Sequence, residues 1–291
     1  MDKDIVIYKK PSLRHPRMVA AFHGWADVTQ AGTFAISYLA TRLRAKEFAI
    51  IDAEEYYDFS TCRPVATISQ GVIQSVKSPH NHFYYATEPT GNGDIVLLIG
   101  IEPHLKWHRF VKLTLDFTDK LGVEQIYLLG GLYDEVPHTV SPRLTGAASQ
   151  QHLVQTLKEH HIEALDYHGP SSIYSLILAE CKQRGREAIN LWGHIPFYIH
   201  AENNPVTSLA LLAKLVELLP LKLDLHDMEA AADHFSGKLD RLIVENPELR
   251  EYIQALERQY RTGRRAAAKD PGSTDRIIKE VESFLQKERQ G

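Results

Sequence analysis

Residues 123–149, VEQIYLLGGLYDEVPHTVSPRLTGAAS, decide the fold class of this chain. Residues 123–129 are almost continuously apolar, which is typical of a strand in a parallel sheet that helices cover on both faces. Gly130 and Gly131 follow, and residues without Cβ let the backbone turn sharply or let another group approach closely. We therefore predict a buried strand that ends at the two glycines. The residues after it should lie at the carboxyl edge of a sheet, where α/β proteins place their sites.

The loop after the glycines carries side chains that can transfer protons or contact anions. His138 and Arg143 lie in this loop together with Asp134 and Glu135. Carboxylates next to His and Arg in a loop form surface ion pairs more often than they perform chemistry. The loop is a candidate site with a structural alternative, and a helix is expected after it at residues 146–160.

Strands, glycine or proline loops and helices alternate from residue 18 to residue 219. Buried strands are predicted at residues 18–22, 48–51, 94–100, 123–129 and 189–193. A hairpin is expected between strands at residues 67–76 and 82–86, with its turn at residues 79–81. This order predicts an α/β fold, a three-layer α/β/α domain whose mostly parallel sheet is made mixed by the hairpin.

The loop after the first buried strand has the sequence HGWAD at residues 23–27 and precedes a helix predicted from residue 28 to residue 43. Asp27 stands where an N-cap residue accepts backbone N–H groups, and Trp25 is expected to fill the core. A helix start behind a glycine loop can instead bind an anion, because its free N–H groups and its dipole point there.

Two further loops place candidate residues at the ends of strands. Glu102 follows residues 94–100, where it either faces a cleft or complements the dipole of the next helix. His194 follows residues 189–193. We expect the loops to converge, so that Trp25, Glu102, His138 and His194 are neighbours. The full set of predicted cleft residues is Gly24, Trp25, Asp27, Glu102, Gly130, Gly131, His138, Arg143, Trp192 and His194.

The composition excludes several classes of protein. The 291 residues are 44% hydrophobic and 24% charged, as in an ordinary globular protein. A net charge of -4 argues against a nucleic-acid binder, whose surface would be basic. Cys62 and Cys181 support neither a disulfide framework nor a zinc site, and we expect no metal and no cofactor. Residues 1–20 do not resemble a signal peptide and no apolar run could span a membrane, so a cytoplasmic location is expected.

Residues 221–291 form a helical C-terminal region in our interpretation, next to an α/β domain at residues 1–220. Charged and alanine-rich segments dominate this region, and apolar side chains recur there at helical spacing. Short helices are marginally stable alone in water, so their apolar stripes should pack on the α/β domain or on a neighbouring subunit. A hinge is expected at residues 262–273.

Five short motifs in order along the chain are similar to those of one family. They are residues 22–27 (FHGWAD), 55–58 (EYYD) with 63–64 (RP), 99–103 (IGIEP) with Trp107, 129–131 (LGG) with 136–139 (VPHT), and 191–196 (LWGHIP) with Tyr198 and 204–205 (NP). Together they span most of residues 18–220. The combination resembles the proteasome assembly chaperone family in its bacterial and archaeal branch.

This resemblance implies a fold similar to phosphorylases and peptidyl hydrolases, and it implies homo-oligomers. Eukaryotic members of the family are non-catalytic chaperones for the α-ring of the proteasome. Members that dock into the proteasome end in a hydrophobic residue, a tyrosine and one further residue. This chain ends in Glu288-Arg289-Gln290-Gly291, so docking through the C-terminus is not expected.

Three functions are compatible with these observations. The leading hypothesis is a non-catalytic assembly chaperone or interaction protein with a protein partner, which the family resemblance favours. Aromatic residues in the edge loops, such as Trp25 and Tyr133, suit an interface as well as a core. The alternative is a phosphorylase-like, hydrolase-like or ATP-dependent ligase-like enzyme acting at the carboxyl edge of the sheet. No serine or cysteine stands in a nucleophile elbow, and no glycine-rich nucleotide loop is present. The third is a sensor that binds an anion or small ligand near Asp27.

Overall fold

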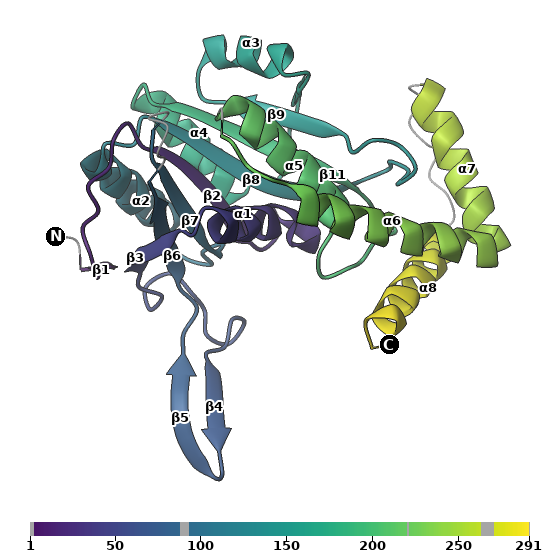
Figure 1. Cartoon of the computed structure of the whole chain (residues 1–291), viewed down its shortest axis with the longest axis horizontal. Coiled ribbons are helices and arrows are strands. Elements are labelled where there is room, and N and C mark those ends of the chain that lie inside the picture. The colour runs from purple at the N-terminus through teal and green to yellow at the C-terminus, as the bar shows by residue number, and fades with distance from the viewer. Residues whose placement is uncertain (1–2, 88–92, 220, 263–270, 291) are drawn as a thin grey trace.

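A nine-stranded sheet forms the centre of the molecule, and helices cover both of its faces (Figure 1). The structure is a computed structural model that describes residues 3–87, 93–219, 221–262 and 271–290. The strands of the sheet, in spatial order, are β1 (Ile5–Ile7), β3 (Lys46–Ile51), β6 (Asn81–Ala86), β7 (Ile95–Ile101), β2 (Arg17–His23), β8 (Gln125–Asp134), β11 (Glu187–Pro196), β9 (Leu144–Ala148) and β10 (Glu163–Ala164).

The helices pack in two layers, with further helices at the C-terminus. Helices α1 and α5 contact each other on one face of the sheet, and α2 and α4 contact each other on the opposite face. The helical elements are the 3-10 turn η1 (Val28–Gln30), α1 (Ala31–Arg42), α2 (Trp107–Leu121), α3 (Gln151–Glu159), α4 (Ile173–Gln183), α5 (Pro205–Leu218), α6 (His226–Glu245), α7 (Pro247–Thr262) and α8 (Pro271–Gln290).

The four central strands are parallel, and this arrangement fixes where the loops meet. β7, β2, β8 and β11 pair in parallel, so their carboxyl ends lie at one edge of the sheet. β1, β3 and β6 continue the sheet on one side in antiparallel order, and β9 runs antiparallel to β11 on the other. The predicted α/β fold with a mixed sheet between helix layers is confirmed.

The strand at the centre of the sheet is longer than predicted. β8 continues through Gly130 and Gly131 to Asp134, and it pairs with β11 along its whole length. The prediction that the glycines end the strand is wrong. The close approach that glycine permits explains their presence. A Cβ on Gly130 would lie 2.7 Å from the carbonyl oxygen of Ala26, and one on Gly131 would lie 3.0 Å from that of Val28. The chain after β2 therefore crosses β8 in direct backbone contact.

The predicted hairpin is also wrong in its partners. β6 belongs to the central sheet, between β3 and β7. A separate two-stranded sheet forms from β4 (Val65–Ser69) and β5 (Val72–Lys77), and Gln70 and Gly71 make its turn with positive φ angles. The sheet is mixed because of β1, β3, β6 and β9. Figure 1 shows the β4–β5 hairpin standing away from the rest of the molecule.

A strand replaces the first part of the helix expected at residues 146–160. Residues Leu144–Ala148 form β9, which pairs with β11 and β10, and α3 begins only at Gln151. Local composition favoured a helix because this segment is rich in alanine. Pairing with two strands overrides that preference. Gly146 lets α3 return closely over β9, since a Cβ there would lie 2.8 Å from a methyl group of Leu157.

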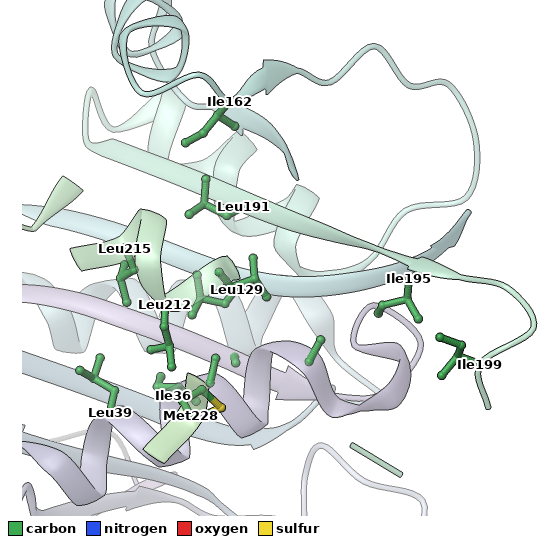
Figure 2. Packing of buried hydrophobic residues seen from close by; sticks show 14 of the residues in the cluster. Ile36, Leu39, Leu129, Ile162, Leu191, Ile195, Ile199, Leu212, Leu215 and Met228 are labelled. Atoms are coloured by element: carbon green, nitrogen blue, oxygen red, sulfur yellow. The ribbon is translucent and has the colours of Figure 1, made fainter. Parts of the chain in front are cut away.

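The C-terminal helices contribute side chains to the same hydrophobic cluster as the central sheet. Figure 2 shows Ile36 of α1, Leu129 of β8, Leu191 of β11, Leu212 of α5 and Met228 of α6 in this cluster. Buried residues of α7 and α8 belong to it as well. The apolar stripes expected in residues 221–291 therefore pack within the same chain. Most of the hinge expected at residues 262–273 lies outside the described residues.

Replacing Gly130 with alanine should lower the free energy of unfolding by about 1–3 kcal/mol, because the new Cβ would be forced against backbone and two aromatic rings. Gly237, in the middle of α6, is the matched control, since a Cβ there meets no atom within 4 Å. Gly237→Ala should raise the stability by about 0.5–1 kcal/mol. Urea denaturation of both variants measures the difference, and equal effects would contradict the close contact at Gly130.

Candidate functional site

The carboxylate of Asp27 lies at the amino end of α1, buried under the loop that follows β2. Oδ1 accepts the N–H of Gly32 at 2.6 Å, and Oδ2 accepts the N–H of Thr33 at 3.0 Å and its hydroxyl at 2.6 Å. Asp27 thus accepts N–H groups of the first turn of α1, as expected, but the N-cap residue of α1 is Gln30, because the turn η1 separates Asp27 from the helix. Thr29 and Gln30 in this turn have positive φ angles, which non-glycine residues adopt at an energetic cost.

Burial governs the protonation of Asp27, whose side chain is 1% exposed. Loss of hydration raises its pKa to about 6, and the three donors from Thr33 and Gly32 act in the opposite direction. The anion site suggested for this helix start is therefore already filled by a carboxylate of the chain itself. That leaves the N–H groups of Gly32 and Thr33 engaged within the protein.

Glu102 serves a helix other than the one that follows it. Its Oε1 accepts the N–H of Ile173, the first residue of α4, at 2.8 Å, and the backbone N–H of Trp25 is a second donor. Burial raises the pKa of Glu102, while these two hydrogen bonds lower it, and the net direction is upward. Glu102 thus joins the end of β7, the loop after β2 at residues 24–28 (the Trp25 loop) and the start of α4, and it complements the dipole of α4.

Tyr174, which sequence analysis did not single out, bridges β2 and β8 where they separate. The two strands pair only through Arg17–Ala20 and Gln125–Leu128. Beyond this point the Tyr174 hydroxyl accepts the N–H of Phe22 at 2.9 Å and donates to the carbonyl oxygen of Leu129 at 2.7 Å. It satisfies two buried backbone groups that would otherwise lack partners.

Trp25 does not fill the core, and the sequence prediction for it is wrong. Its side chain is 61% exposed at the mouth of a cavity of about 360 Å³ that Gly131 and Trp192 also line. The backbone around Trp25 is fixed by Glu102 and by the contact of Ala26 with Gly131, so the indole is directed outward. Apolar character alone could not separate an exposed tryptophan from a buried one.

His194 joins a carboxylate and a hydroxyl in a line. Its Nδ1 lies 2.7 Å from Oδ2 of Asp134, and its Nε2 lies 2.9 Å from the hydroxyl oxygen of Thr145. Burial raises the pKa of Asp134, but the hydrogen bond and charge of His194, with the charge of Arg143, outweigh it and hold the pKa below its usual value. An acid, an imidazole and a hydroxyl in this order are the parts of a hydrolytic triad.

The surroundings of this triad do not give a substrate access. Thr145 is 2% exposed and His194 is 5% exposed. The cavity that His194 lines has room for about 20 Å³, which is little more than one water molecule. Sequence analysis missed Thr145 because it placed this residue at the end of a loop, whereas the structure places it in β9, which pairs with β11.

Arg143 and His138 are held by partners within the chain. Arg143 forms a two-pronged ion pair with Glu163, at 2.9 and 2.8 Å, and contacts Asp134 at 3.2 Å. The hydroxyl of Tyr198 accepts the backbone N–H of His138 at 2.9 Å and lies 2.6 Å from its Nδ1. Burial lowers the pKa of His138 despite the nearby charges of Asp240 and Glu257. The neutral ring is therefore favoured.

The structure thus brings the predicted residues together in two groups. Gly24, Trp25, Asp27, Glu102, Gly130, Gly131 and Trp192 surround the crossing of the Trp25 loop over β8. His138, Arg143 and His194 lie beyond it, near the end of β11. In the part of the chain that the structure describes, no hydrogen bond or ion pair joins the two groups.

No group of three or more His, Cys, Asp or Glu side chains among the described residues is placed to hold a metal ion. Within the same residues, no helix combines the length and the apolar character needed to cross a membrane.

Comparisons with known proteins identify the family of this chain. The sequence profile of the PAC2 family matches residues 21–243. The chain belongs to the PAC2 family. None of the curated proteins matches it. The matched range of this PAC2 protein contains every candidate residue described above.

Two bacterial crystal structures are similar to this PAC2 protein in sequence as well as in fold. A PAC2 family protein of Streptomyces avermitilis is 33% identical, with 81% of this chain and 99% of that chain covered and a TM-score of 0.75. A proteasome-assembly chaperone homologue of Mycobacterium tuberculosis is 31% identical, with the same coverage and TM-score. An archaeal proteasome activator of Pyrococcus furiosus is 22% identical over 83% of this chain and 98% of that one, and its TM-score of 0.66 shows a shared fold.

The stability of this PAC2 protein should depend on pH through Asp27. Because its pKa is about 6 when folded, against a usual 3.8, the folded state holds the proton more tightly than the unfolded state. The contribution of protonated Asp27 to the free energy of unfolding is complete below about pH 4 and is lost as the pH rises through about 6. The change is about 3 kcal/mol at most. The measurement is urea denaturation of wild type and Asp27→Asn at several pH values.

The asparagine variant cannot titrate at this position, and the other ionisable groups are common to both proteins. Between about pH 4 and pH 7 the wild type should therefore lose stability relative to Asp27→Asn, as measured by the difference in their free energies of unfolding. A difference that stays constant over this range would show that Asp27 has an ordinary pKa.

Proposed function

We propose that this PAC2 protein is a non-catalytic interaction protein of the proteasome-assembly type, which works as a homo-oligomer. The observation that carries the proposal is the β4–β5 hairpin. Five β-branched apolar residues of the hairpin are each more than half exposed, and they are Val65, Ile68, Val72, Ile73 and Val76. A protein that works as an isolated monomer does not ordinarily leave so many large apolar side chains of one small element in water.

The edges of this hairpin carry little of the usual protection against pairing with another strand: the pairing has one register shift, between Thr67 and Ile68, and Lys77 at the end of β5 is its one charged residue. Edge strands of monomeric proteins are blunted by charges, proline or bulging, or are covered by other elements. Residues 65–76, VATISQGVIQSV, contain no charged residue and no proline. A two-stranded sheet is at best marginally stable alone in water, and three or more strands with a buried face are needed for stability. The hairpin should therefore be ordered by an added strand.

A second copy of this chain is the partner that these properties favour. Two identical uncharged edges can pair in antiparallel order about a two-fold axis, which gives a four-stranded sheet and a self-complementary interface. The opposed pair Ile68 and Ile73 would then lie within a shared apolar face. Relatives that are a proteasome-assembly chaperone homologue and an archaeal proteasome activator support a role in binding proteins.

Introducing charge on the hairpin tests the proposal. The double variant Ile68→Lys, Ile73→Lys should dissociate to a single chain, because like charges placed opposite each other repel and cannot be buried at an interface. Light scattering after gel filtration measures the mass of each species. Val244→Lys is the matched control, since Val244 is an exposed aliphatic residue on α6, and its mass should equal that of the wild type. A monomeric wild type, or an oligomeric double variant, would refute the proposal.

The aligned Asp134, His194 and Thr145 favour a second candidate, a hydrolase, and we propose that their role is structural instead. The line ties β8, β9 and β11 together in a place with no room for a substrate. Thr145→Val keeps the shape of the side chain and removes its hydrogen bond, which should cost about 1–2 kcal/mol of stability.

Hydrolysis of p-nitrophenyl acetate should proceed at the same background rate in the wild type and in Thr145→Val. A wild-type rate that disappears in Thr145→Val, while circular dichroism shows an intact fold, would favour the hydrolase.

A further inference from the structure

The cavity beside Trp25 contains a buried polar group, the side-chain oxygen of Asn190, that has no hydrogen-bond partner among the described residues. It holds about 360 Å³ between the Trp25 loop, the end of β8, β11 and the start of α4. This volume falls within the range of pockets that bind small molecules. Its wall is largely aromatic and aliphatic, with Trp192, Leu132, Leu165 and Leu178 among the lining residues.

None of the side chains that line the cavity carries a formal charge. A charged ligand would lose its hydration there without gaining an opposite charge, and that loss is costly. The lining therefore selects an uncharged ligand. Asp27 and Glu102 lie close to the cavity in the fold, but their carboxylates are engaged by backbone N–H groups and do not line it.

Asn190 supplies an unsatisfied hydrogen-bonding group among the residues that line the cavity. It is 2% exposed, and its Oδ1 has no hydrogen-bond partner among the described protein groups. Asn190 lies on β11, between Leu128 of β8 and Ala147 of β9. An unpartnered buried amide oxygen destabilises a protein by about 1–3 kcal/mol, so it is uncommon unless something else satisfies it.

A second buried polar group lines the same cavity. Ser172 is 2% exposed, and although it precedes α4 its hydroxyl does not cap that helix. At the mouth, Trp25 and Tyr167 are more than half exposed, which leaves two aromatic faces at the entrance. The cavity thus combines an aromatic entrance, an apolar body and hydrogen-bonding groups that are shielded from solvent.

We propose that this cavity is a binding site for a small, uncharged, ring-containing molecule whose amide or hydroxyl group hydrogen-bonds to Asn190. The apolar part of the ligand lies against Trp192 and the leucine side chains, and Trp25 covers it at the mouth. The ligand supplies the donor that the buried Oδ1 of Asn190 lacks. This site is independent of the proposed self-association through the β4–β5 hairpin.

Three probes of similar size test the proposal on the full chain. Benzamide has the ring and the amide, toluene has the ring alone, and benzoate adds a charge. Titration calorimetry and the fluorescence of Trp25 and Trp192 report binding. Benzamide should bind with a Kd on the order of 1 mM, as expected for a ligand of this size, and benzoate should bind at least about tenfold more weakly.

The variant Asn190→Leu replaces the amide with an apolar side chain. It should lower the affinity for benzamide about tenfold, which corresponds to one lost hydrogen bond. The affinity for toluene should stay within about twofold of the wild-type value. Its melting temperature should rise, since an unsatisfied polar group has been removed. Asn203→Leu, which lies outside this cavity, is the matched control and should change neither affinity. Trp25→Ala should lower the affinity for both probes. Because Trp25 is exposed, this variant should fold, and it serves as the test if Asn190→Leu does not fold.

Absence of binding by both benzamide and toluene, each tested up to its solubility in water, would overturn the proposal, because a cavity of this volume admits either molecule. Equal affinity of benzamide for wild type and a folded Asn190→Leu would overturn it as well. Binding that appears only in the double variant Ile68→Lys, Ile73→Lys would show that a neighbouring subunit occupies the cavity, which would also exclude a small-molecule site.

Discussion

The crossing of the Trp25 loop over β8 is the contact on which the rest of the structure depends. Backbone meets backbone there, because the carbonyl oxygens of Ala26 and Val28 approach Gly130 and Gly131 with no room for a side chain. The approach continues into α1, where a Cβ on Gly32 would lie 2.3 Å from the carbonyl oxygen of Leu129. Three glycines therefore set the distance between the first helix and the central strand.

So close an approach leaves backbone N–H groups without water, and a buried carboxylate satisfies them. Asp27 accepts the donors of the first turn of α1, Glu102 accepts those of α4 and the Trp25 loop, and the Tyr174 hydroxyl bridges β2 and β8. His194 and Arg143 are used in the same way near the end of β11. Residue types that suit catalysis serve here as hydrogen-bond partners for backbone and for one another. Asn190 contrasts with them, because its Oδ1 finds no partner among the described groups.

The C-terminal helices and the β4–β5 hairpin both carry apolar side chains, but only the helices bury theirs. The stripes of α6, α7 and α8 are buried against the sheet domain, where Tyr252 of α7 packs edge-on against Phe197 and Tyr198. The apolar side chains of β4 and β5 find no surface of their own chain and remain exposed (Figure 1). A helix satisfies its backbone internally and needs only one apolar contact, whereas an isolated hairpin also leaves strand edges open.

The sequence by itself determined the α/β fold, the buried central strands and the family resemblance, because apolar runs and their alternation with amphipathic helices are local patterns. Asp27 as a helix cap could also be predicted, since capping acts over a few neighbouring residues. Only the tertiary structure decided that Gly130 and Gly131 continue a strand, that residues 144–148 pair as β9 and that β4–β5 stands apart. It also decided that Trp25 faces outward and that Glu102 serves α4. Each of these depends on a partner distant in sequence, and neither spacing nor residue type identifies that partner.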